Sequence, residues 1–104
     1  MLQAIARVEE VVARFSKDQF LEDWMVQDSL LHELQTLGEA AGRVSKPLLA
    51  ANPGIPWSEM SALRHKIVHD YFVIDLDVVW DTATIDVPAV RPLVQSLLGR
   101  AEAD

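Results

Sequence analysis

The sequence predicts an all-α protein that folds as one antiparallel bundle of four to five helices. Apolar residues recur every three or four positions along most of the chain, which is the helical period. Capping residues and prolines divide this pattern into segments of ordinary helix length. The chain has 104 residues, half of them apolar, which suits a single domain with its own core. Residues 73–74 and 84–87 have some strand character, but neither segment has a partner strand.

The first half of the chain should form two longer helices with a short one between them. We expect the first at about residues 2–15 and the longest at about 24–46. Between them, Ser16 and Gln19 have the spacing of a capping box, which predicts the start of a short helix. Pro47 either ends the long helix or allows one more loose turn after it. The apolar positions expected to be buried in the two longer helices are Ile5, Val8, Val12, Phe15, Val26, Leu30, Leu34, Leu37, Ala41 and Val44.

The second half should continue as helices after a loop. Residues 52–56, Asn-Pro-Gly-Ile-Pro, make the clearest loop of the chain, and a helix should begin directly after it. Asp75 is placed to cap the next helix. Asp86 is placed to cap the last one, which tolerates Pro88 in its first turn. The apolar positions of these last two helices are Leu76, Val79, Trp80, Val90, Leu93, Val94 and Leu97.

Composition excludes several classes of protein. The chain has no cysteine, so disulfides and thiolate chemistry are ruled out and a reducing compartment fits. No apolar run approaches the roughly 20 residues that span a bilayer. No basic segment followed by an apolar stretch marks a secretory signal. We therefore expect a cytoplasmic protein that has no membrane partner.

The net charge of −7 opposes non-specific binding of nucleic acid, because contacts with phosphates supply most of that affinity. The charges are unevenly distributed, however. Arg43, Lys46, Arg64 and Lys66 lie in one part of the chain, with Glu59 as the one acid among them. We therefore expect a local positive patch on an otherwise acidic body.

Residues 57–72, WSEMSALRHKIVHDYF, carry the densest chemistry of the chain. Arg64 and Tyr71 are seven residues apart, so a helix places them within about 20° of each other. An arginine that snorkels from the edge of the bundle over a core tyrosine would explain this spacing without any function. His69 follows Arg64 by five residues, which is about 140° round the helix. One helix therefore cannot aim both head groups at one point unaided.

A second copy of this helix would bring the groups together. A two-fold dimer that packs the helix against its mate places two arginines and two histidines in one cleft. Cleavage of RNA through its own 2′-hydroxyl needs a base for that hydroxyl and an acid for the leaving oxygen, and histidine serves in either role near neutral pH. A guanidinium can hold the phosphate in a fork and stabilise its developing charge. Arg64 and His69 are therefore the candidate catalytic residues.

A metal site is the rival explanation of the histidines. His65 and His69 are four residues apart, a spacing that can bind zinc. Lys66, however, stands where the usual metalloprotease motif has glutamate. No third ligand is evident, because Asp70 points about 100° away from His69. We therefore expect no metal.

Small and aromatic residues are explained by packing. Gly38 and Gly42 lie one turn apart on the long helix, which predicts that another helix approaches closely there. Trp24, Trp57 and Trp80 are expected to anchor the core or an interface, because their wide separation gives no stacking array for bases.

The motif Arg64-x4-His69-x-Tyr71, at the end of a run of helices, resembles that of the HepT-like toxins of the HEPN superfamily. The resemblance extends beyond the motif and covers about residues 2–98. The segments that carry it, in the order typical of that family, are residues 20–23 (FLED), 27–28 (QD), 37–41 (LGEAA), 55–57 (IPW), 69–72 (HDYF) and 75–80 (DLDVVW).

This resemblance implies an all-helical homodimer whose paired motifs line a shared cleft. It implies metal-independent endoribonuclease activity on RNA, such as tRNA or mRNA, without a cofactor bound by this chain. Arg64 would bind and polarise phosphate, and His69 would transfer protons. The supporting positions beside them would be His65, Lys66 and Asp70.

The resemblance also implies a toxin–antitoxin operon. The antitoxin would be a minimal nucleotidyltransferase of the MNT type, which transfers AMP from ATP onto the motif tyrosine, here Tyr71. An adenylyl group on Tyr71 would add bulk and phosphate charge beside Arg64 and compete for its guanidinium. The modification would thereby neutralise the toxin.

Two alternatives stay open at this point. The chain could be a helical dimer that binds nucleotides, RNA or a partner protein without hydrolysis, which the net charge of −7 favours. It could also be a purely structural helical dimer in which Arg64 and His69 only shape a polar interface.

Overall fold

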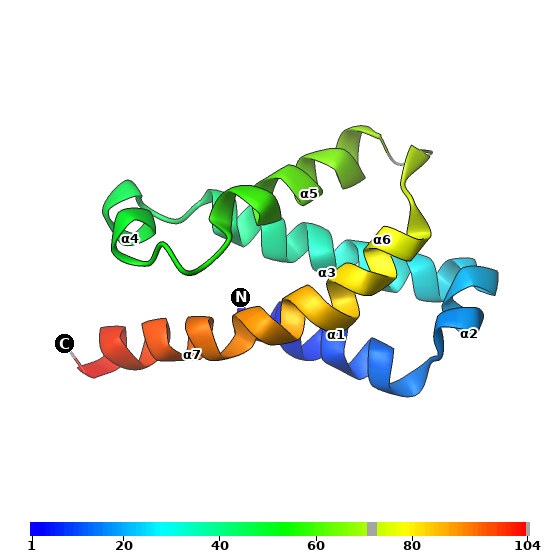
Figure 1. Ribbon diagram of the computed structural model, residues 1–104, viewed down its shortest axis with the longest axis horizontal. Helices are drawn as coiled ribbons and strands as arrows, with labels where there is room; N and C mark the ends of the chain where they lie inside the picture. The colour runs from blue at the N-terminus through cyan, green and yellow to red at the C-terminus, as the bar shows by residue number, and fades with distance from the viewer. Residues whose placement is uncertain (71–72, 104) are drawn as a thin grey trace.

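The computed structural model describes residues 1–70 and 73–103, with side chains through Leu97. Every regular element in these ranges is helical, which confirms the predicted all-α class. Figure 1 shows an elongated molecule, with extents of 46 × 27 × 17 Å. Among the described residues, no helix combines the length and the hydropathy needed to cross a bilayer. The helices are α1 (Leu2–Arg14), α2 (Lys17–Glu22), α3 (Trp24–Gly42), α4 (Lys46–Ala51), α5 (Trp57–His69), α6 (Leu76–Asp81), the π-helical η2 (Thr82–Asp86) and α7 (Val87–Ala103).

Helix α3 is the centre of the bundle. It packs against α5 on one side and α1 on the other, and α7 lies beside α1 (Figure 1). The short α2 contributes Phe20, which is fully buried and whose ring centroid lies 5.3 Å from that of Trp80. The core thus lies between α1, α3 and the α6–α7 segment, while α5 covers the opposite flank of α3.

Most positions that were expected to be buried are confirmed. The prediction is wrong for Leu93, whose side chain is exposed. Trp57 is buried and Trp80 packs against the core, whereas Trp24 is 67% exposed and anchors no part of the core. The confirmed positions are Ile5, Val8, Val26, Leu30, Leu34, Leu37, Ala41, Val79, Val90 and Val94, with Val12, Phe15, Val44, Leu76, Trp80 and Leu97 partly buried against them.

The predicted caps at two helix starts are confirmed. The Ser16 hydroxyl accepts from the Gln19 N–H at 3.2 Å, and the Ser16 N–H donates to Gln19 Oε1 at 2.8 Å. This reciprocal pair satisfies two backbone donors that α2 leaves without helical partners. Asp75 caps α6 in a similar way, because its carboxylate accepts from the Asp77 N–H at 2.9 Å.

The long helix ends earlier than predicted. It stops at Gly42 and not near Lys46, because the Arg43 N–H turns back to the carbonyls of Ala40 and Ala41 in a tightened last turn. Lys46 then begins the separate α4, in which Pro47 occupies the first turn, where its missing N–H costs nothing.

Asp86 does not begin a new helix, so that prediction is wrong. Helix α6 passes through η2 directly into α7, with helical backbone angles at Thr82 and Val87. Pro88 has no N–H for the carbonyl four residues earlier, and its ring crowds that carbonyl in an ordinary helix. The wider π turn just before Pro88 relieves this crowding, which lets the helix continue.

Candidate active site

Helix α5 packs along α3 and is also tied down at its beginning. The Trp57 indole is buried, and its Nε1–H donates to the Asn52 carbonyl at 3.0 Å, which ties the helix to the preceding loop. Farther along, Ile67 is the other buried side chain of α5. Met60 and Leu63 pack partly buried against the core, and the opposite side of the helix is exposed to contacts with other molecules.

The contact between α5 and α3 is unusually close at Gly38. A Cβ at this position would lie 2.3 Å from Arg64 Cβ and 2.7 Å from the Met60 carbonyl oxygen. No side chain fits there, which confirms the predicted close approach at Gly38. At Gly42, by contrast, a Cβ would meet only the Ser61 hydroxyl at 3.8 Å, an ordinary contact. The close approach is therefore confined to Gly38.

Arg64 lies along the flank of α3. Its Cβ and Cγ face Gly38, and its Nη2 lies 3.6 Å from Glu39 Oε1, both side chains being 38% exposed. The Nε atom is enclosed and has no hydrogen-bond partner among the described residues. Glu39 Oε1 also accepts from Gln35 Nε2 at 3.3 Å. The arginine thus has a packed stem and a half-exposed head beside a carboxylate.

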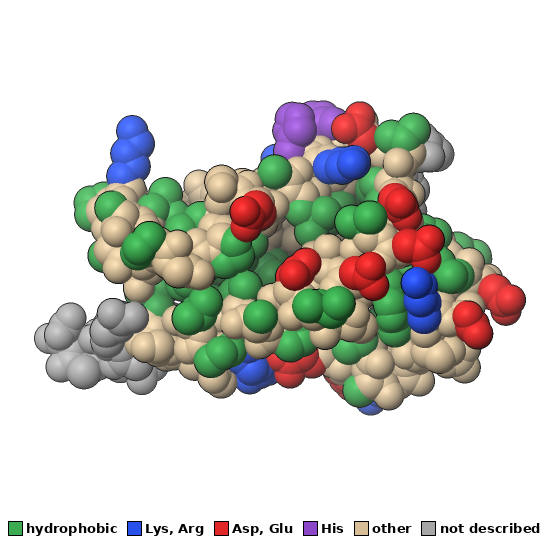
Figure 2. Space-filling model, in the orientation of Figure 1, with side chains coloured by type: hydrophobic (Ala, Val, Ile, Leu, Met, Phe, Trp, Pro, Cys, Tyr) green, Lys and Arg blue, Asp and Glu red, His purple; other side chains and the backbone are tan. Residues whose placement is uncertain are grey.

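The two histidines of α5 are exposed. The rings of His65 and His69 have centroids 4.4 Å apart and are tilted by 43°. Figure 2 shows histidine side chains in purple on the outer surface of the molecule, above α5. Among the described residues, Arg64 pairs with Glu39 of α3 and the His69 ring contacts His65, and none of these contacts joins the guanidinium to an imidazole. This agrees with the wide angle between the two positions on the helix.

The remaining predicted site residues are placed as follows. Lys66 and Asp70 are exposed, and the Asp70 N–H donates to the Lys66 carbonyl at 2.8 Å where α5 ends. Tyr71 lies outside the described residues. Across the part of the chain that the structure describes, no three histidine or carboxylate side chains gather in a group able to hold a metal ion.

Charge on the surface is dominated by acids. Arg43, Lys46 and Lys66 are exposed, and the face in Figure 2 shows basic side chains beside the histidines as well as at separate points elsewhere. Between α2 and α6, Lys17 Nζ lies 3.0 Å from Asp77 Oδ1, and this hydrogen bond and charge raise the pKa of Lys17 above its ordinary value. Such an exposed pair adds little to stability.

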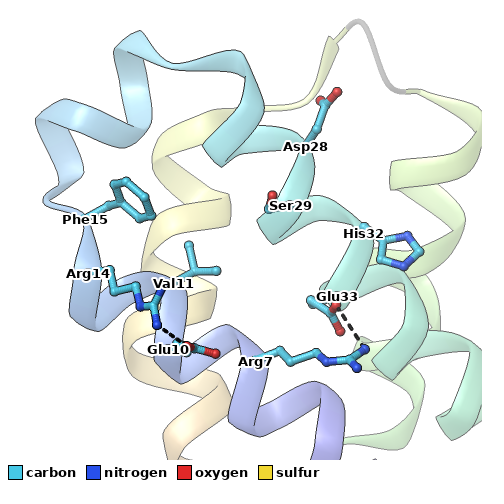
Figure 3. A pocket seen from close by; sticks show the side chains of 9 residues that line it. All are labelled: Arg7, Glu10, Val11, Arg14, Phe15, Asp28, Ser29, His32 and Glu33. Carbon is cyan, nitrogen blue, oxygen red and sulfur yellow. Dashed lines mark ion pairs between the residues drawn. The ribbon is translucent and has the colours of Figure 1, made fainter.

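A cavity lies between α1 and α3, at positions far in sequence from Arg64 and His69. It has a volume of about 580 Å³, and Figure 3 shows Arg7 pointing across it to Glu33, with the Arg14–Glu10 pair beside them. Arg7 Nη1 lies 3.6 Å from Glu33 Oε1, and Glu33 Oε2 is enclosed without a hydrogen-bond partner among the described residues.

A groove of about 570 Å³ between α3, α5 and α7 is largely apolar.

Comparison with known proteins bears on this site. The family model described as "Ribonuclease HepT-like" matches residues 1–97, which include the whole motif. The chain belongs to the HepT-like ribonuclease family. It is 32% identical over 95 residues to "Probable ribonuclease HepT" of Thermococcus cleftensis, covering 91% of this chain and 86% of that protein. It is 34% identical over 89 residues to "Putative RNase MJ0127" of Methanocaldococcus jannaschii, covering 82% and 74%. No solved structure matches the chain.

Two features of this HepT-like site were not predicted from the sequence. One is the pairing of Arg64 with Glu39, and the other is the support that Gln35 gives to Glu39. Gln35 and Glu39 have the one-turn spacing of neighbours on a helix, which signals their mutual contact. Their contact with Arg64 depends on how α3 and α5 pack, which spacing along one helix does not determine.

Replacing Gly38 by alanine should destabilise this HepT-like chain by about 1–2 kcal/mol, because overpacking by one methyl group outweighs the better helix propensity of alanine. Gly42→Ala is the matched control, since its methyl group meets only an ordinary contact. That variant should be neutral or more stable by up to about 1 kcal/mol. Urea unfolding followed by circular dichroism measures both, and equal stability of the two variants would contradict the close approach.

Proposed function

We propose that this chain is the toxin of a toxin–antitoxin pair, and that it cleaves RNA as a two-fold homodimer without a metal ion. One observation carries the proposal. In a chain of the HepT-like ribonuclease family, Arg64 and His69 lie on the same helix but meet different neighbours, α3 and His65. A second copy that packs against α5 would bring two guanidinium and two imidazole groups into one cleft.

The chemistry needs only these groups. The His69 imidazole of one copy takes the proton of the ribose 2′-hydroxyl, whose oxygen then attacks the adjacent phosphorus. The bond from phosphorus to the 5′-oxygen breaks, and the imidazolium of the other copy protonates that oxygen. The products are a 2′,3′-cyclic phosphate and a 5′-hydroxyl. Arg64 donates to the non-bridging oxygens and stabilises the charge that develops on them.

The neighbouring side chains support this arrangement. His65 is in ring contact with His69, and this contact limits the orientations of the catalytic imidazole. Lys66 is exposed on the same helix and is able to meet the next phosphate of the RNA. Asp70 is exposed at the end of α5, where its carboxylate is available to the imidazolium form of a histidine.

Tyr71 is the proposed point of control. An MNT-type nucleotidyltransferase transfers AMP from ATP to its hydroxyl, forming a bond from the tyrosine oxygen to the α-phosphorus and releasing pyrophosphate. The attached phosphate then competes with RNA for Arg64. ATP is used by the antitoxin, so the toxin itself binds no cofactor. A cytoplasmic location fits both the RNA substrate and this partner.

A helical dimer that binds nucleotides, RNA or a partner without cleavage is the second candidate. Two observations favour it, namely the net charge of −7 and the Glu39 carboxylate that already faces Arg64. Under this alternative, Arg64 and His69 contribute to binding alone. Cleavage assays on purified protein separate the two candidates.

Arg64→Ala and His69→Ala should each lower the rate of RNA cleavage by about 10²-fold or more, because they remove charge stabilisation and proton transfer respectively. The measurement is cleavage of labelled RNA in EDTA, which also tests independence from metal ions. Arg14→Ala and His32→Ala, which change the same residue types at exposed positions outside the motif and outside the expected positive patch, are the matched controls and should keep full activity. Rates equal to wild type in all four variants would remove the active-site assignment.

Mixed dimers should show that one cleft needs both histidines. When wild-type and His69→Ala chains are unfolded together in equal amounts and refolded, random pairing leaves about a quarter of the dimers with two intact chains. Activity should therefore fall to about a quarter of the wild-type value, since the mixed dimers are inactive. Activity near one half would mean that each chain holds its own complete site. Mass spectrometry of the intact dimers checks that pairing is random.

Tyr71→Phe should cleave RNA like the wild type and resist silencing by the nucleotidyltransferase with ATP, because it lacks the hydroxyl that accepts AMP. Cleavage before and after incubation with that enzyme measures the effect, and intact-protein mass spectrometry detects the added AMP on the wild type. Silencing of Tyr71→Phe that still depends on ATP would rule out Tyr71 as the point of control.

A further inference from the structure

We propose that Gly38 and Glu39 of α3 position the Arg64 guanidinium for catalysis, the first through the stem of the side chain and the second through its head. The inference rests on the proposed function, because it assigns a purpose to Arg64 as a phosphate ligand. Two independent contacts carry it, one a backbone approach and the other an ion pair supported by a hydrogen bond.

The contact at Gly38 confines the stem. Arg64 Cβ and Cγ occupy the space that a side chain at position 38 would fill, and Nε is enclosed without a hydrogen-bond partner among the described residues. The inner half of the side chain therefore has little freedom to change rotamer. An arginine loses much rotamer entropy when it is ordered. Here folding has already ordered the stem, so that phosphate binding does not have to.

The contact with Glu39 orients the head. Arg64 Nη2 lies 3.6 Å from Glu39 Oε1, whereas a strong charge-assisted hydrogen bond is about 2.7–2.9 Å long. The pair therefore attracts the guanidinium without saturating its five N–H donors. Glu39 is itself held, because Gln35 Nε2 donates to the same oxygen at 3.3 Å from one turn earlier on α3.

Two other roles are conceivable for Glu39, and each gives a different result. A carboxylate that masks Arg64 from RNA would weaken binding, so its removal would tighten RNA binding and speed cleavage. A surface ion pair without a role would leave cleavage unchanged. The packed stem favours positioning, since the contact with Gly38 and the enclosed Nε leave few rotamers that would carry the guanidinium away from Glu39.

The kinetic test uses the full chain and a labelled single-stranded RNA of mixed sequence, in EDTA. Glu39→Gln should lower kcat about tenfold and change KM less than about twofold, because a misplaced guanidinium stabilises the transition state poorly. Glu39→Asp should recover part of the loss, since it restores the charge. Glu59→Gln, which removes the same charge from an exposed position on α5, is the matched control and should keep full activity. Unchanged kcat, or tighter binding with faster cleavage, in Glu39→Gln would overturn the inference.

A double-mutant comparison separates this inference from the proposed function. In the Arg64→Ala background, Glu39→Gln should cause no further loss, because the carboxylate acts only through the guanidinium. If Arg64→Ala cleaves as well as wild type, the proposed function fails. If Arg64→Ala is inactive while Glu39→Gln is fully active, only the positioning role fails.

A second readout is independent of cleavage. In ¹⁵N-labelled protein, the Nε–H NMR signal of Arg64 should be sharp, and it should shift and broaden in Glu39→Gln and in Gly38→Ala. The signal of the exposed Arg43 serves as an internal reference and should not change. Melting temperatures should stay equal for wild type and Glu39→Gln, since the pair is half exposed. An Arg64 signal that is identical in wild type and Glu39→Gln would overturn the inference, whether or not the RNA is cleaved.

Discussion

The close approach of α5 to α3 at Gly38 is the constraint on which the rest of the site depends. It brings the backbone of α5 near enough that Arg64 Cβ occupies the space of a missing side chain. Helix α5 buries Trp57 and Ile67, and Met60 and Leu63 pack partly buried against the same core, so an apolar stripe holds it against α3. The missing side chain at Gly38 adds close van der Waals contacts between the two helices over a short length. The helix can then present polar side chains outward without losing its position.

This packing divides the polar groups of α5 between two directions. Arg64 is directed along α3 and His69 is left in solvent beside His65. Each group alone is unremarkable, since a half-exposed arginine beside a glutamate and a pair of surface histidines occur in proteins of many kinds. Because the chain belongs to the HepT-like ribonuclease family, the separate placement of Arg64 and His69 bears on how a nuclease site could be assembled. The proposed site shared between two copies would place two Arg64 guanidinium groups and two His69 imidazoles against one RNA phosphate, which would offer an acidic chain a local point of attachment.

Helical periodicity and capping chemistry predicted most of the fold, because both are local signals. The prediction failed where a longer-range effect decided the outcome. Asp86 has the chemistry of a cap, yet the π turn before Pro88 keeps the helix continuous, since the buried side chains of Ala83 and Val87 hold both sides of that turn to the core. The long helix ends at Gly42 because the chain tightens there, with the Arg43 N–H turned back to the Ala40 and Ala41 carbonyls, which the spacing of apolar residues does not reveal.

For the candidate site, too, local signals in the sequence predicted where residues lie along one helix but not which residues of other helices they meet. The positions of Arg64 and His69 on one helix, and their separation round it, follow from spacing along the chain. The partner of Arg64 does not, because Glu39 lies on another helix and the register between the two is set by Gly38. The pairing of the buried Glu33 with Arg7 was not predicted either, because it also joins two different helices, α3 and α1. Contacts between helices carry information that periodicity within one helix lacks.

A glutamate beside the proposed phosphate ligand repels an approaching phosphate, yet it is consistent with catalysis. Tight binding of RNA in the ground state would not speed its cleavage, because only interactions that strengthen in the transition state lower the barrier. Glu39 lies beside the Arg64 guanidinium and, as proposed, orients it before the reaction begins. As attack by the 2′-hydroxyl builds more negative charge on the phosphate oxygens, the guanidinium interacts more strongly with them than with the fixed carboxylate. The proposed role of Glu39 is therefore to keep the guanidinium in place for the reacting phosphate, with little effect on the affinity for RNA in the ground state.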